Sequence, residues 1–135
     1  MESNECINHL MNRAQQTVHQ QFRAALTEFG VTPVQYAVLS TLWKEGSLTP
    51  SQIAAAVSLD SSTVTGILDR LEQKKLLRRM PDKTDRRVLR ISLTEAGSAL
   101  EAPVMQAVDR CNKAVMTVYS SEEQELLVRL LQRLS

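Results

Sequence analysis

Apolar residues recur every three or four positions along most of the chain, a spacing that places them on one face of an α-helix. The longest stripe comes first and consists of Ile7, Leu10, Met11, Ala14, Val18, Phe22, Ala25, Leu26 and Phe29. Shorter stripes predict further helices at residues 34–43, 50–57, 61–75, 94–118 and 121–134. Pro103 is expected to kink the helix at 94–118, because proline removes one backbone donor and crowds the preceding turn.

The period changes to two between residues 86 and 93. Val88 and Arg90 fall on one face there, and the apolar residues Leu89, Ile91 and Leu93 fall on the other. Residues 76–80 form a plausible partner strand, and the polar link 81–85 has the composition of a turn. The pattern therefore predicts a small β-hairpin within a mainly α-helical chain.

Side chains that cap helices mark where most of these elements begin. Two segments share the order Thr, Pro, any residue, Gln, in which Thr caps, Pro takes the first helical position and Gln closes a capping box. The predicted N-caps are Thr32, Thr49, Asp60, Thr94 and Ser120. Gly30 and Gly46 lie where left-handed residues would end the preceding helices.

Charge is distributed unevenly along the chain. The net charge is +1, yet residues 61–93 contain nine basic and four acidic residues, which leaves the remainder with a net charge of −4. A local basic block on a near-neutral chain indicates a surface for a polyanion. The alternative is an ordinary solvated face.

Composition narrows the class of protein. A chain of 135 residues with 43 % hydrophobic residues predicts one globular domain, or one subunit of an oligomer, and no apolar run approaches a membrane span. The first five residues are polar and acidic, so we expect no secretory leader. Cys6 and Cys111 make no disulfide framework, which favours a cytoplasmic location. No nucleophile–base motif, phosphate loop or ligand cluster is visible, so we expect neither an enzyme nor a metal or cofactor site.

The predicted helices at 50–57 and 61–75 are separated by only three residues, which is the geometry of a helix-turn-helix. The second helix presents small hydroxyl residues near its N-terminus, where they can approach a DNA major groove closely. Its candidate DNA-contacting residues are Ser61, Ser62, Thr63, Thr65, Gly66, Asp69 and Arg70. An ordinary amphipathic helix with a polar exposed face is the alternative.

The tip of the predicted hairpin gathers the cations Lys83, Arg86 and Arg87, which suit the negative potential of a minor groove. Asp82 and Asp85 lie among them. We expect an aspartate beside an arginine to hold the arginine side chain and brace the loop by a charge-assisted hydrogen bond.

Four segments in this order resemble the MarR family of transcriptional regulators. They are Leu59-Asp60-Ser61-Ser62-Thr63-Val64-Thr65, Leu68-Asp69-Arg70-Leu71-Glu72, Asp85-Arg86-Arg87 and Leu93-Thr94-Glu95-Ala96-Gly97. The resemblance implies a winged helix-turn-helix dimer that binds a pseudo-palindromic operator in double-stranded DNA and commonly represses a nearby gene. By that likeness residues 61–73 are the recognition helix and residues 81–87 are the wing. Arg86 matches the arginine that enters the minor groove, and Asp85 matches its acidic neighbour.

The terminal segments have the apolar faces expected of a homodimer interface. Dimerisation helices are predicted at residues 1–31 and 98–135, on either side of the DNA-binding region at 32–97. The candidate interface residues are Ile7, Leu10, Leu126, Leu127, Leu130, Leu131 and Leu134. Packing of the three terminal helices within one subunit is the alternative.

The prediction of a small-molecule effector comes from the resemblance alone. Members of the MarR family often bind small aromatic acids or phenols in a crevice beside the dimer helices. His9, Arg13 and Tyr36 are candidates for this crevice, with surface positions as the alternative. Cys6 suggests the oxidant-sensing branch instead, yet the first helix lacks that branch's tyrosines and Cys6 lies slightly too early. Cys111 is expected in the core. A winged helix that has lost DNA binding is a further alternative, which the retained Arg86 and Arg87 oppose.

Overall fold

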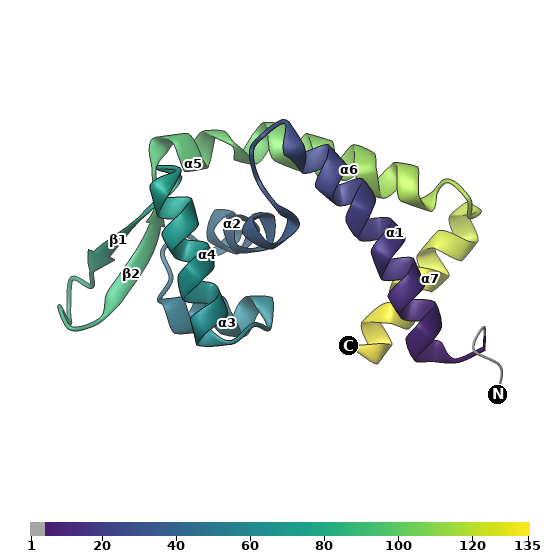
Figure 1. Cartoon of the computed structure of the whole chain (residues 1–135), viewed down its shortest axis with the longest axis horizontal. Helices are drawn as coiled ribbons and strands as arrows, with labels where there is room; N and C mark the ends of the chain where they lie inside the picture. The colour runs from purple at the N-terminus through teal and green to yellow at the C-terminus, as the bar shows by residue number, and fades with distance from the viewer. Residues whose placement is uncertain (1–4) are drawn as a thin grey trace.

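The computed structural model describes residues 5–135, so residues 1–4, on which the expectation about a leader largely depends, lie outside it. The described part is mainly helical with one antiparallel hairpin, which confirms the predicted fold class (Figure 1). Its elements are α1 (Ile7–Thr27), α2 (Pro33–Glu45), α3 (Pro50–Val57), α4 (Ser61–Gln73), β1 (Leu77–Pro81), β2 (Leu89–Leu93), α5 (Glu95–Ala99), α6 (Glu101–Met116) and α7 (Ser121–Leu134).

The predicted caps are confirmed at each of the five positions. At the start of α2 the Gln35 N–H donates to Thr32 Oγ1 at 3.1 Å, and the Thr32 N–H donates to Gln35 Oε1 at 3.2 Å. The same reciprocal box starts α3 and α7, while Asp60 and Thr94 each accept an N–H from the first turn of their helices. These bonds are local in sequence, which is why the pattern of residue types could predict them.

The prediction of one kinked helix over 94–118 is wrong, because the chain breaks at Leu100 into α5 and α6. Pro103 has no N–H to donate to the Ala99 carbonyl, and its ring crowds that carbonyl. The helix therefore ends one turn before the proline, and Leu100 serves as the C-cap of α5 and the N-cap of α6.

The hairpin is shorter than the predicted strand at 86–93. Its register runs from Leu77 opposite Leu93 to Pro81 opposite Leu89. Residues 86–88 belong to the connecting loop instead, where the Val88 N–H donates to the Asp85 carbonyl at 3.0 Å. The alternation of apolar and polar residues thus begins inside the loop. Turn hydrogen bonds there replace the hydrogen bonds that would pair two strands. Leu48 extends the sheet by an isolated bridge to Ile91.

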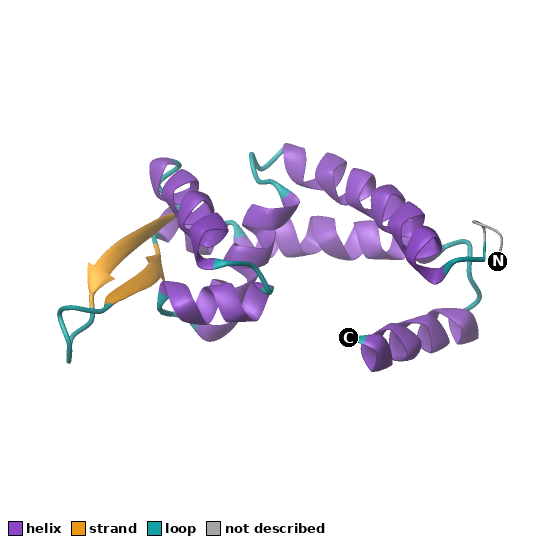
Figure 2. Cartoon of the chain, turned by 60° about the horizontal axis from the view of Figure 1, so that its bottom comes forward, coloured by secondary structure: helices purple, strands orange, loops and turns teal. Residues whose placement is uncertain are grey.

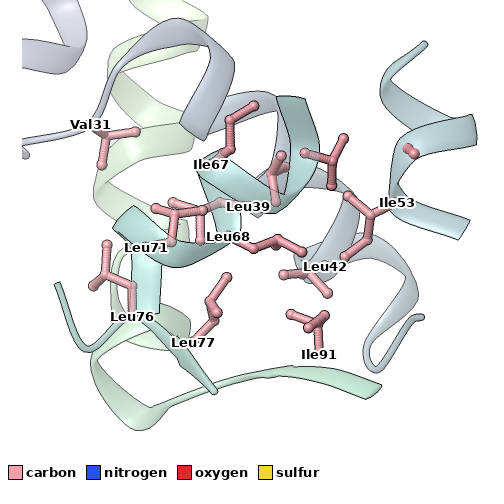
Figure 3. Packing of buried hydrophobic residues seen from close by; sticks show 13 residues of the cluster. Val31, Leu39, Leu42, Ile53, Ile67, Leu68, Leu71, Leu76, Leu77 and Ile91 are labelled. Carbon is pink, nitrogen blue, oxygen red and sulfur yellow. The ribbon is translucent and has the colours of Figure 1, made fainter. Parts of the chain in front are cut away.

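The main core lies in the middle of the chain, where α2, α3, α4 and the hairpin surround one cluster of aliphatic side chains (Figure 3). Leu39, Leu42, Ile53, Leu68 and Ile91 are among its members, and each is at most 1 % exposed. The apolar stripes of α2, α3 and α4 supply most of this cluster, which confirms that these faces point inward, except that Val34 at the start of the α2 stripe is 41 % exposed.

A second, smaller cluster joins the two long helices. Leu26 of α1 packs with Val104 and Val108 of α6, and α1 lies along α6 (Figure 1). Cys111, on the same face of α6, is buried as predicted. The hairpin projects from one end of the molecule, while α7 turns back beneath α6 at the other end (Figure 2). Within residues 5–135, no helix combines the length and apolar character needed to cross a bilayer.

Candidate nucleic-acid interface

Two local features fix the turn between α3 and α4, one in the backbone and one in a capping side chain. Ser58 ends α3 in the left-handed conformation with φ of 57°. Asp60 then accepts hydrogen bonds from the Thr63 N–H at 2.7 Å and from Ser62 Oγ at 3.1 Å. The hydrogen bonds from Thr63, side chain and then backbone, and from Ser62 hold the pKa of Asp60 below its ordinary value. The carboxylate therefore stays ionised at the N-terminus of α4, where it complements the helix dipole.

Helix α4, the predicted recognition helix, divides into a buried and an exposed face. Val64, Ile67, Leu68 and Leu71 are buried. Six of the seven predicted DNA-contacting residues are exposed, and Gly66 is half-buried: the exposed six are Ser61, Ser62, Thr63, Thr65, Asp69 and Arg70. All of these residues lie on one helix. Their side chains are free to contact a ligand except where another residue of the same chain already forms a hydrogen bond with them.

Three of the seven have such partners: Ser62, whose hydroxyl donates to Asp60 as described above, Thr65 and Asp69. Thr65 Oγ1 donates to the Ser61 carbonyl at 2.9 Å, so this hydroxyl has its acceptor lone pairs left for a ligand. Asp69 accepts from Arg79 Nη2 at 2.6 Å. The assignment of these three residues as DNA contacts stays a prediction.

The wing at residues 81–87 presents three cations to solvent. Lys83, Arg86 and Arg87 are all exposed, and Arg87 donates from Nε to Asp85 Oδ1 at 3.1 Å. The side chain and then the backbone N–H of Arg87 hold the pKa of Asp85 below its ordinary value. Among the described residues, Arg86 has no ion-pair or hydrogen-bond partner for its guanidinium, which leaves it available for an external anion.

Asp82 organises the loop that carries these cations. It accepts from the backbone N–H groups of Thr84 and Asp85 at 3.1 and 3.0 Å, from the Thr84 hydroxyl, and from Arg90 Nε at 2.7 Å. The Thr84 hydroxyl, the Arg90 guanidinium and the two N–H groups hold the pKa of Asp82 far below its ordinary value. Arg90 also donates to the Ser47 carbonyl at 3.0 Å, which ties the hairpin to the α2–α3 loop.

Asp82 and Arg90 confirm the expectation that an aspartate braces the loop, as do Asp85 and Arg87. The position of Arg79 was not expected from the sequence. Arg79 is basic and lies in the most basic stretch, yet its guanidinium binds the carboxylates of Asp69 and Glu72. Only the hairpin register reveals this contact, because it sets which strand side chains face α4.

The residues expected to form an effector crevice do not meet within one chain. Tyr36 is half-buried, with its ring centroid 6.4 Å from that of Trp43 and its hydroxyl 4.0 Å from Met105 Sδ. His9 and Arg13 are exposed in the first two turns of α1, a helix about 30 Å long. The opposite end of that helix is the one connected to α2.

A hollow of about 520 Å³ lies between α2 and α6, beside Tyr36. It is lined by Ser40, Trp43, Lys44, Glu101 and Met105. Trp43 Nε1 donates to the Gly97 carbonyl at 3.0 Å, so this wall is anchored to α5. These lining residues were missed because the contact of α2 with α6 joins segments far apart in the sequence.

The two cysteines occupy different environments. Cys6 is half-buried at the N-cap of α1 and makes no side-chain cap bond. Burial raises the pKa of the Cys111 thiol, which keeps it protonated at neutral pH. Among residues 5–135, no three histidine, cysteine or carboxylate side chains are grouped as a metal site would require.

A short helix, a tight turn and a recognition helix flanked by a hairpin make this fold a winged helix-turn-helix, a class that binds double-stranded DNA. A profile of the MarR family matches residues 31–89. The regulator PecS of Dickeya dadantii is 35 % identical over 130 residues, which cover 94 % of this chain and 74 % of PecS. The repressor MdtR of Bacillus subtilis is 39 % identical over 114 residues, covering 83 % and 71 %.

A solved structure extends the similarity to nearly the whole fold. BpsR of Bordetella bronchiseptica superposes with a TM-score of 0.92 at 27 % identity, covering 99 % of this chain and 96 % of BpsR. That structure was described as showing how 6-hydroxynicotinic acid regulates DNA binding of BpsR. The chain belongs to the MarR family, and it is a DNA-binding transcriptional regulator.

Proposed function

We propose that this protein is a homodimeric repressor, acting in the cytoplasm, that binds a pseudo-palindromic operator and is released by a small aromatic acid or phenol. The observation that carries the proposal is that one folded unit presents both a polar helix face and a cationic loop to the solvent. The exposed polar face of α4 and the exposed cations of the wing are both fixed to a single core. A helix suits the major groove, and a narrow cationic loop suits the neighbouring minor groove.

The dimer is supported by apolar side chains that the chain itself leaves uncovered. None of the residues of α7 is buried. Among the predicted interface residues, Leu127 alone is half-buried. The other members are exposed: Ile7, Leu10, Leu126, Leu130, Leu131 and Leu134. A second copy would cover these faces and gain the free energy of burying apolar surface. Two-fold symmetry would then set two copies of α4 about one DNA turn apart.

The contacts to DNA follow from this arrangement. The N-terminal half of α4 would read base edges through Ser61, Ser62, Thr63, Thr65 and Gly66, with Arg70 one turn further along. Lys83, Arg86 and Arg87 would meet the phosphates that line the minor groove, with Asp85 holding Arg87 in place.

The effector proposal is supported by the hollow between α2 and α6. Trp43 offers an aromatic surface there, and Lys44 offers a cation for a carboxylate. Tyr36 borders the same region, whereas His9 and Arg13 would need the dimer to bring them close. The regulation of BpsR by an aromatic acid supports the same class of ligand.

Displacement from DNA tests the effector proposal. The wild-type protein is used to select a duplex from a random-sequence pool, and the anisotropy of that labelled duplex is followed while 6-hydroxynicotinate or 4-hydroxybenzoate is added. We expect release by an aromatic acid, weakened in Lys44→Ala but not in Lys113→Ala, whose cation lies on α6 and pairs with Asp109. Cyclohexanecarboxylate, an acid without an aromatic ring, is added for comparison. If neither aromatic acid releases the duplex any better than cyclohexanecarboxylate does, this part of the proposal is contradicted.

A cysteine-based oxidant sensor is the second candidate, favoured by the position of Cys6 at the N-terminus of α1. We expect peroxide to release the duplex less effectively than an aromatic acid, because no tyrosine supports Cys6 in that helix. Cumene hydroperoxide is added to the wild type and to Cys6→Ser. Full release of the wild type that is lost in the variant would establish the oxidant sensor instead.

A further inference from the structure

We infer that Arg79 is a positioning residue for operator recognition: it joins the wing-bearing hairpin to the recognition helix and offsets one of the two negative charges there, and it does not itself contact DNA. The inference rests on the proposed DNA-binding function. It assigns a role to the one cation of the basic block that binds two acidic side chains of α4.

The geometry of this contact is specific. Arg79 Nη2 donates to Asp69 Oδ1 at 2.6 Å, and Nη1 donates to Glu72 Oε1 at 2.7 Å. The Arg79 backbone N–H also approaches Glu72 Oε2, at 3.4 Å. Asp69 and Glu72 are three residues apart on α4 and so lie on the same side of the helix. One guanidinium therefore spans two carboxylates, which its planar fork can do and a lysine ammonium cannot do equally well.

The hairpin register explains why Arg79 faces the protein. Arg79 pairs with Ile91, and side chains of directly opposed residues point to the same face of a hairpin. Ile91 is fully buried in the main core, so that face is turned toward α4. The side chain of Arg79 is accordingly only 20 % exposed, although it carries a full charge.

The carboxylates, in contrast, are open to the solvent on the helix that reads DNA. The side chains of Asp69 and Glu72 are 55 % and 43 % exposed. Without a cation between them, both would repel the phosphates of an operator lying against α4. Arg79 offsets one of these two negative charges and at the same time fixes the orientation of the hairpin relative to the helix, so that both DNA-contacting elements are presented in one geometry.

A double-mutant cycle separates this role from direct contact with DNA. Arg79→Ala is introduced into the wild type and into a background in which Asp69→Asn and Glu72→Gln have already removed the carboxylates. The probe is the duplex selected by the wild type, with a scrambled duplex for comparison. Arg78→Ala, in the neighbouring exposed position that faces away from Ile91, is the matched control in both backgrounds.

We expect Arg79→Ala to weaken binding at least about fivefold in the wild type and less than about twofold in the neutral background, since its partners are then already gone. Arg78→Ala should have the same effect in both. Arg79→Lys keeps the charge, so it should retain affinity for the scrambled duplex while losing preference for the selected one. Circular dichroism melting checks that each variant is folded, as expected because both carboxylates are largely open to solvent.

Three other results would contradict either the positioning role or the proposed function. An equal loss from Arg79→Ala in both backgrounds, or no loss in the wild type, would overturn the positioning role while leaving the protein a DNA-binding regulator. A wild type that selects no sequence from the pool would contradict the proposed function itself.

Discussion

At position 75 the backbone adopts a left-handed conformation that a side chain disfavours. Lys75 follows the end of α4 with φ of 63°, where the chain turns into β1. Lys75→Gly should raise the free energy of unfolding by about 1 kcal/mol, because glycine adopts this conformation without strain. Urea unfolding measures the change. Lys75→Ala removes the same side chain without relieving the backbone and should give no gain, so a gain equal to that of glycine would contradict the explanation.

Substitution by alanine should have opposite effects at two glycines. A Cβ at Gly97 would lie 2.0 Å from the Leu76 carbonyl oxygen, so Gly97→Ala should destabilise the fold by about 2 kcal/mol or more. A Cβ at Gly66 would meet no atom within 4 Å, so Gly66→Ala should stabilise α4 by up to about 1 kcal/mol. Thermal melting of both variants is the measurement. Stabilisation by Gly97→Ala would show that α5 is not packed against Leu76 as described.

Among the elements, the positions where helices begin were predictable, and the exact bounds of the hairpin and of the helices around Pro103 were not. The caps at Thr32, Thr49 and Ser120 depend on residues three positions away, and the sequence predicted all three. The start of β2 depends on how the loop folds on Asp82, and the break at Leu100 depends on where the helix accommodates Pro103. Alternation and proline position alone do not specify either outcome.

The wing loop should respond to acid through Asp82. Its pKa is lowered in the folded protein by the Thr84 hydroxyl, Arg90 and two N–H groups, so its ionised form stabilises the fold. This contribution is complete above the ordinary aspartate pKa of about 3.9 and disappears as the pH falls through the lower folded value. The stability difference between wild type and Asp82→Asn in urea should thus be constant near neutral pH and shrink below about pH 4. Asp109→Asn, at an exposed α6 position, is the control; a difference that grows in acid would contradict the assignment.

For the molecule as a whole, the sequence predicted which side chains of α4 and the wing are exposed, but it did not predict the hollow between α2 and α6. The exposed face of α4 and the wing cations follow from helical periodicity and from one short basic segment. The hollow beside Trp43 and the contacts of Arg79 arise only when α2 meets α6 and β1 meets α4. Periodicity also shows that the terminal helices are amphipathic, but it does not reveal what covers them.

Dimerisation is tested by placing a charge on the uncovered face of α7. Leu130→Asp or Leu127→Asp should weaken the dimer strongly, because a carboxylate buried without a partner in an apolar interface is costly. Gln132→Asp adds the same charge at a polar position of the same helix and should have little effect. Sedimentation at micromolar concentration measures the oligomeric state. A wild type that sediments as a monomer would contradict the dimer.

DNA binding by the wing and α4 is best tested at Arg86, because this residue is exposed at the wing tip. Anisotropy titrations of the selected duplex are recorded at several salt concentrations for wild type, Arg86→Ala and Arg23→Ala, the last removing an exposed cation of α1. Arg86→Ala should cost about 1–3 kcal/mol of binding free energy and lower the salt slope by about one ion per subunit. Arg23→Ala should change neither quantity. Unchanged affinity and slope for Arg86→Ala, with its melting curve intact, would contradict the claim that the wing binds DNA.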